Sequence, residues 1–127
     1  MATSNNLTNY GADQTAAWWA GKTWYAALMT TKTSKTVAGV EVNQSDYARQ
    51  SVTLSAEGGG THGIIWNGTQ INFGTPLEDW GTVQGITLYD QLTGGNAWMF
   101  FDLAAGVDCA ASAPVSIPVN QLVETLT

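Results

Sequence analysis

The 127-residue sequence contains very few of the residues that carry catalysis or hold small folds together covalently. It has one cysteine, Cys109, and one histidine, His62. A single cysteine excludes an intramolecular disulfide, and no Cys and His cluster is present to bind zinc. No nucleophile is paired with a general base, and we interpret His62 as a loop residue. We therefore predict a protein that is not an enzyme, folds by packing alone and needs no metal or cofactor.

Positive charge is equally scarce. The chain has four Lys or Arg residues against ten Asp or Glu, and its formal net charge is -6 at pH 7. No cation follows Arg49, whereas seven carboxylates lie between Glu57 and Glu124. A surface of this kind repels phosphates instead of releasing counterions from them. We therefore do not expect a nucleic acid partner.

Long apolar runs are absent as well. The most apolar stretch, residues 97–101, is far shorter than the ~20 residues that a membrane-spanning helix requires, so we expect no membrane partner. Apolar residues still make up 44% of the chain, which excludes disorder for most of it, and the length fits one domain. We predict a polar, flexible N-terminal arm over residues 1–9 and a single β domain over residues 10–127.

The residue pattern predicts one short helix followed by strands. Residues 11–21 are rich in alanine, with Asp13 as a possible cap and Gly21 as a stop. From Thr23 onward, short runs of β-branched and aromatic residues alternate with polar ones between glycines. The predicted strands are 24–31, 47–55, 63–66, 69–73, 83–89, 97–103, 115–119 and 122–126. Eight short strands favour a mainly β fold, an antiparallel β-sandwich of jelly-roll type with one short N-terminal helix.

Three local signals refine this fold. Asn67 and Gly68 lie between two apolar runs and predict a tight hairpin with a type I′ turn. A slip in the apolar pattern at Gly85 predicts a β-bulge there. Pro114 and Pro118 lack the backbone donor that a central strand needs, so the segment between them is predicted at a sheet edge.

Six tryptophans exceed what one small core absorbs. We expect three of them in the core, namely Trp24, Trp66 and Trp80. Neighbouring helical residues diverge by about 100° around the helix axis, so the adjacent pair 18–19 cannot be buried together. The strand 97–101 is apolar on both faces, which indicates that one face meets another chain. The predicted interface residues are Trp18, Trp19, Trp98 and Phe100.

A second group of residues is predicted to have a structural role. Tyr47 and Arg49 share one face of a strand, and Trp80 and Gly81 form a further short motif. Because Arg49 is the only arginine of a chain rich in carboxylates, we expect its guanidinium to bridge a loop such as 78–79. Those two carboxylates are adjacent, and on a strand they would point to opposite faces, so we do not interpret them as a catalytic pair.

The order of several motifs resembles a family of small tailed-bacteriophage virion proteins, labelled tail-fibre-like and including capsid decoration, or cement, proteins. The resemblance covers most of the chain. It is carried, after a short N-terminal helix, by the segments 25–30, 47–54, 67, 71–73, 80–83, 86–90 and 94–96. The Leu-rich helix of the family is replaced here by Ala and Trp.

This resemblance implies a structural protein of the virion. Our main expectation is a capsid decoration protein on the outer surface of the phage head. Its expected partners are the major capsid protein and itself, as a homo-oligomer such as a trimer. The alternative within the virion is a tail or tail-fibre component. An alternative from another class is a carbohydrate-binding module that uses exposed tryptophans.

Overall fold

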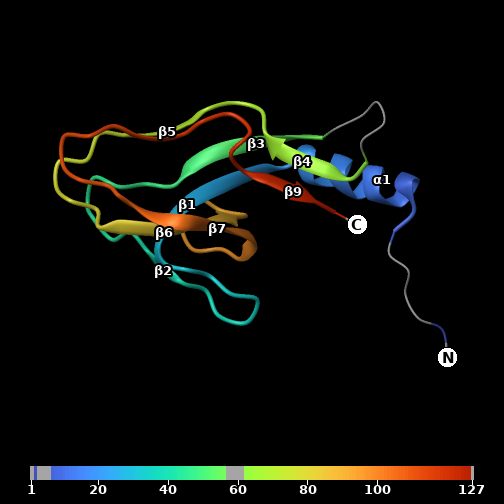
Figure 1. Cartoon of the computed structure of the whole chain (residues 1–127), viewed down its shortest axis with the longest axis horizontal. Coiled ribbons are helices and arrows are strands. Elements are labelled where there is room, and N and C mark those ends of the chain that lie inside the picture. Colours follow the sequence, from blue (N-terminus) through green and yellow to red (C-terminus); the bar gives the residue numbers. More distant parts are fainter. Residues whose placement is uncertain (1, 3–6, 57–61, 127) are drawn as a thin grey trace.

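The computed structural model describes residues 2, 7–56 and 62–126. Figure 1 shows one helix at one end of an elongated β structure. The elements are α1 (Asn9–Ala20), β1 (Thr23–Thr31), β2 (Val40–Glu41), β3 (Gln50–Ala56), β4 (Ile64–Asn67), β5 (Ile71–Gly74), β6 (Thr82–Tyr89), β7 (Ala97–Asp108), β8 (Val115–Ile117) and β9 (Val123–Thr125). Part of the predicted N-terminal arm lies outside the described residues.

Helix α1 begins two residues earlier than the composition predicts. Its N-cap is Thr8, whose hydroxyl accepts a hydrogen bond from the Gly11 backbone at 3.0 Å. Asp13 is therefore inside the helix and is not its cap. Two small residues, Ala12 and Ala16, are buried on the face that packs against β3 and β4. The helix ends at Gly21, as predicted.

Most strands belong to one curled antiparallel sheet with the order β7-β6-β1-β3-β4-β9. The eight predicted strands are all present with shifted ends. Strand β2 is an addition that pairs with β1 at Met29 and Glu41. It has only two residues and therefore produces no periodic pattern in the sequence.

Strands β5 and β8 form a separate two-stranded sheet that closes the core. The predicted antiparallel β-sandwich with one short helix is confirmed. The position of the Pro114 to Pro118 segment at a sheet edge is also confirmed, because each strand of a two-stranded sheet is an edge. Side chains from both sheets meet in the main core cluster, which includes Trp24, Leu28, Leu54, Ile65, Ile71, Phe73, Trp80, Ile86, Leu88 and Ile117.

The predicted hairpin at Asn67 and Gly68 is wrong. Strand β4 pairs with β3 and β9, β5 pairs with β8, and neither residue has a positive φ. The Asn67 side chain is instead fully buried. Its amide donates to the carbonyls of Thr69 and Pro118 at 3.1 and 2.8 Å and accepts from the Leu122 backbone at 2.9 Å. Asn67 thus joins the two sheets, a role that short-range turn rules do not detect.

The predicted irregularity at Gly85 is confirmed, although the extra residues lie on β7. Val83 pairs with Val107 and Gly85 with Asp102, so β7 carries the longer path. A Cβ at Gly85 would lie 2.8 Å from the Phe101 carbonyl oxygen. This close approach of two backbones explains the glycine.

Two of the three tryptophans predicted in the core are buried there, and the third is not. Trp24 and Trp80 are buried in the core as expected. Trp66 is only half-buried, because burial alternates along β4 and Trp66 lies on its outer face.

Within the described part of the chain, α1 is too short and too polar to cross a membrane.

We expect Asn67→Ala to lower the free energy of unfolding by about 3 kcal/mol. The substitution leaves the buried Leu122 N–H and the part-buried carbonyls of Thr69 and Pro118 without their side-chain partner, and each unsatisfied buried group costs about 1–3 kcal/mol. Urea unfolding followed by fluorescence measures the change. Asn72→Ala, at an exposed position of β5, is the matched control and should be nearly neutral. A loss below about 1 kcal/mol for Asn67→Ala would contradict this role.

Candidate interaction surface

Four tryptophans from three elements form one cluster beside the C-terminal end of α1. Trp19 stacks on Trp24 with ring centroids 4.5 Å apart, and the Trp24 indole donates to the Trp19 carbonyl oxygen at 2.9 Å. Trp98 lies 5.4 Å from Trp24 and 5.5 Å from Trp18. The cluster therefore connects the core, through Trp24, to the surface.

The two adjacent tryptophans of α1 lie in different environments, one against the core and one at the surface, as the helical geometry predicts. Trp19 is half-buried against the core, whereas Trp18 is 44% exposed. Trp98 is 48% exposed, and the Lys22 ammonium lies 5.3 Å from the centre of the Trp18 ring. We call the exposed rings of Trp18 and Trp98 the aromatic surface.

The other two predicted interface residues are less accessible. Phe100 is half-buried on β7, and Trp19 packs inward. Met99, Phe101 and Leu103 of the same strand pack against the main core. The two-sided apolar pattern of β7 thus has one side in the core. Whether the aromatic surface meets another chain remains a prediction.

Asp90 fixes the position of Trp98. One carboxylate oxygen accepts the Asn96 backbone N–H at 2.8 Å, and the other accepts the Trp98 indole N–H at 3.1 Å. The backbone bond from Asn96 and then the bond from Trp98 lower the pKa of Asp90. Gly95 lies beside this carboxylate with φ +74°, where a Cβ would collide with it. The loop before Trp98 is therefore ordered around an ionised side chain.

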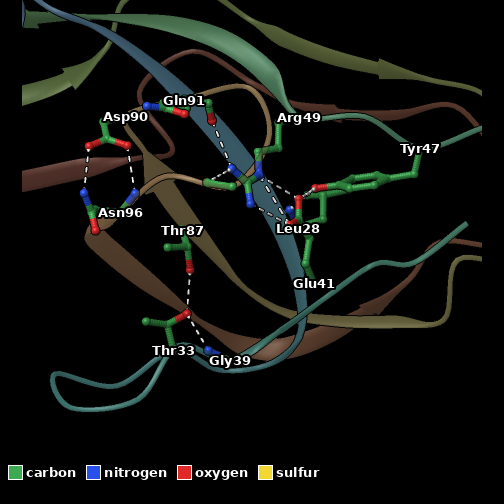
Figure 2. A network of polar contacts seen from close by, with 11 residues as sticks. Leu28, Thr33, Gly39, Glu41, Tyr47, Arg49, Thr87, Asp90, Gln91 and Asn96 are labelled. Atoms are coloured by element: carbon green, nitrogen blue, oxygen red, sulfur yellow. Dashed lines mark hydrogen bonds and ion pairs between the residues drawn. The ribbon is translucent and has the colours of Figure 1, made fainter.

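Arg49 holds the same loop from the opposite side (Figure 2). Its Nη1 donates to the carbonyl oxygens of Gln91 and Gly94 at 2.9 and 2.7 Å. Its Nε and Nη2 donate to the two carboxylate oxygens of Glu41, each at 3.0 Å. The guanidinium also lies 3.7 Å from the centre of the Tyr89 ring. One side chain therefore joins β2, β3 and the β6–β7 loop.

Tyr47 completes this network. The predicted shared strand face is wrong, because both Tyr47 and Arg49 precede β3, and they meet through Glu41 instead. The Tyr47 hydroxyl donates to Glu41 at 2.7 Å and accepts the Leu28 backbone N–H at 2.9 Å, as Figure 2 shows. Burial, and then the hydrogen bond to Glu41, raise the pKa of Tyr47 far above its ordinary value. The hydroxyl therefore acts as a neutral donor.

The predicted carboxylate partner of Arg49 is wrong. Glu41 takes the place expected for the 78–79 pair, and Asp79 instead accepts the Ala111 backbone N–H at 2.8 Å. Glu41 was missed because it lies on the two-residue strand β2. The sequence signal for this ion pair was the single arginine, which was expected to pair with one of the carboxylates.

Trp80, the first residue of the Trp80 and Gly81 motif, packs beside the Tyr47 ring. The Trp80 indole donates to Asp46 at 3.0 Å and packs edge-on against Tyr47 at 5.4 Å. Gly81 has φ +91° and accepts a hydrogen bond from the Cys109 backbone. These two residues thus shape the start of β6 and do not form part of the aromatic surface.

The remaining polar groups bind within the fold. His62 contacts Asp13 at 2.8 Å and ties the start of β4 to α1, and this hydrogen bond lowers the pKa of Asp13. Burial, and then Asp108, raise the pKa of the Cys109 thiol. Among the described residues, no three His, Cys, Asp or Glu side chains gather in a metal-binding arrangement.

Comparison with protein families identifies the class of protein. A model of the family described as Podophage GP4 fiber I protein gp80 matches residues 2–125. The chain belongs to this family. Neither the curated proteins nor the solved structures contain a match to it. Membership confirms the expected small tailed-phage virion protein, and the fiber description favours the tail-fibre alternative over capsid decoration.

We expect Arg49→Met to lower the free energy of unfolding by about 2–3 kcal/mol. It removes the ion pair while leaving Glu41 partly buried and two loop carbonyls without their donor. Lys32→Met is the matched control, because it removes the same charge from an exposed position. Hydrogen exchange of the Asn96 amide should increase only in Arg49→Met. Equal unfolding free energies and equal exchange rates of the Asn96 amide in the two variants would contradict the stabilising role of the Arg49 contacts.

The Asp90 contacts should make one part of stability pH-dependent. Because folding lowers its pKa, the contribution is present above the ordinary value of 3.8 and is lost as pH falls through the lower, folded value. The gap in unfolding free energy between the wild type and Asp90→Asn should therefore narrow on going from about pH 6 to about pH 2.5. The same comparison, with and without Asp90→Asn, in a Trp98→Phe background should show a smaller narrowing of the gap, because phenylalanine lacks the indole N–H that Asp90 accepts. A constant gap would refute the assignment.

Proposed function

We propose that this protein is a non-enzymatic structural component of a phage tail fibre, and that it binds its neighbours through the aromatic surface. Family membership over nearly the whole chain supports a virion role. The observation that carries the binding site is the display of Trp18 and Trp98. Both rings are nearly half exposed and belong to the tryptophan cluster, and Asp90 also holds Trp98.

Exposed and preorganised tryptophans are suited to protein contacts. Burying a large apolar side chain contributes roughly 1.5–3 kcal/mol, and tryptophan is enriched among residues that dominate interface energies. Rings that are already fixed lose little conformational entropy on binding. The expected partners are a second copy of the chain and an adjoining virion protein.

Carbohydrate binding is the alternative that uses the same residues, since indole rings also stack on sugars. The planes of Trp18 and Trp98 are inclined by 42°, so the two rings do not form one flat platform. This geometry favours a protein contact. A glycan array on the purified protein tests the alternative, and specific binding lost in Trp98→Ala would favour it.

We expect the protein at the tail fibres of purified virions, in a copy number of tens rather than hundreds. Immunogold labelling combined with quantitative mass spectrometry measures both quantities. The major capsid protein of the same particle, labelled in parallel, serves as the location control. Labelling spread over the head at hundreds of copies would overturn the proposal in favour of capsid decoration, and absence from the virion would refute both.

A further inference from the structure

We propose that copies of this chain associate head to tail, with the loop around Leu77 of one copy seated in a groove beside Trp98 of the next. This inference deepens the proposed function and rests on it, because the groove includes part of the aromatic surface. It names the partner of that surface as a second copy. It also assigns a role to the 78–79 carboxylates, which neither the Arg49 network nor the core uses.

The groove lies where the two outer strands of the large sheet approach each other. It has a volume of about 430 Å³ and is lined by the start of β7, the end of β9 and the turn after β1. Trp98, Phe100 and Leu126 provide apolar walls. Lys35 and Glu124 are its charged residues. The groove thus combines an apolar interior with an exposed cation, Lys35, and a half-buried carboxylate, Glu124.

The wall that carries Lys35 is held in place by hydrogen bonds. The Thr33 hydroxyl bonds to the Thr87 hydroxyl on β6 at 2.8 Å and accepts the Gly39 backbone N–H at 3.1 Å (Figure 2). The Ser34 hydroxyl accepts the Val37 backbone N–H at 3.1 Å. The groove is therefore formed before any partner arrives, which lowers the entropic cost of binding.

The loop between β5 and β6 presents a matching projection. Leu77 is 81% exposed, the most exposed of the large apolar side chains in the described part of the chain. Asp46 accepts its backbone N–H at 2.7 Å and also the Trp80 indole N–H at 3.0 Å. The Pro76 carbonyl accepts the Ser112 backbone N–H at 2.9 Å. An exposed leucine on a loop anchored by these bonds is ready to bind.

Charge favours this pairing. Glu78 and Asp79 follow Leu77 and are exposed. All three lysines precede the acid-only part of the chain, and two of them, Lys22 and Lys35, lie at the aromatic surface or the groove. A Leu77 side chain in the groove would bring Glu78 toward Lys35 of the other copy. Contact between like acidic surfaces would instead be repulsive.

The positions of the two surfaces determine the type of assembly. In Figure 1 the β5–β6 loop lies at the end of the long axis opposite α1, whereas β9 and the turn after β1 extend toward α1. A contact between two different surfaces is heterologous, and it forms either a ring or an open row. Because the β5–β6 loop lies at one end of the molecule, away from the groove, the two surfaces do not compete for the same space, and each copy can contact two others.

Mixing two complementary variants tests this arrangement. Leu77→Asn removes the projection but keeps the groove, and Lys35→Glu alters an exposed groove residue but keeps the projection. Each variant alone should associate at least tenfold more weakly than the wild type in sedimentation experiments. An equimolar mixture should form heterodimers and nothing larger, because only one intact pair of surfaces remains. Failure of the mixture to form them would overturn the proposal.

A charge exchange identifies the facing residues. Glu78→Lys placed in the Lys35→Glu chain should restore the association that Lys35→Glu loses, whereas Asp102→Lys in the same background, at an exposed carboxylate outside the groove, should not. Circular dichroism verifies the fold of each variant. A wild type that stays monomeric at high concentration would refute head-to-tail association. If that monomer were still found at the tail fibre, the proposed function would stand and only this inference would fail.

Discussion

The contact between Arg49 and Glu41 is the interaction on which the accessible features of the molecule depend. Glu41 is held by a strand of two residues, and the guanidinium connects it to β3 and to the carbonyls of the β6–β7 loop. That loop bears Asp90, which fixes the Trp98 indole. A planar donor with several N–H groups can satisfy a carboxylate and two carbonyls together, whereas a lysine ammonium cannot match that geometry.

The tryptophan cluster shows how a small fold can display large apolar side chains without losing their positions. Trp24 is buried and supports Trp19, and these two rings support Trp18 and Trp98 at the surface. The small residues Ala12 and Ala16 let α1 lie close to the sheet, which brings its C-terminal end to β7. The resulting surface is rigid, and rigidity reduces the entropy lost when a partner binds.

The distribution of charge complements this arrangement in a fibre protein. The few cations are used locally: Arg49 holds a loop, Lys22 lies over an indole and Lys35 lines the groove. The β5–β6 loop carries exposed carboxylates beside an exposed leucine. Such an asymmetric molecule favours contacts between unlike surfaces over contacts between like ones, which suits a repeating assembly.

The sequence by itself determined the β class, the helix before it, the irregularity at Gly85 and the division of the Trp18–Trp19 pair. These features follow from local periodicity and backbone sterics, which act over a few residues. Tertiary structure alone decided the partner of Arg49, the roles of Asn67 and Asp90, and the half-buried position of Trp66. Asn67 illustrates the physical reason: its turn propensity is weaker than the gain from satisfying three backbone groups, two of which, in Pro118 and Leu122, come from a distant part of the chain.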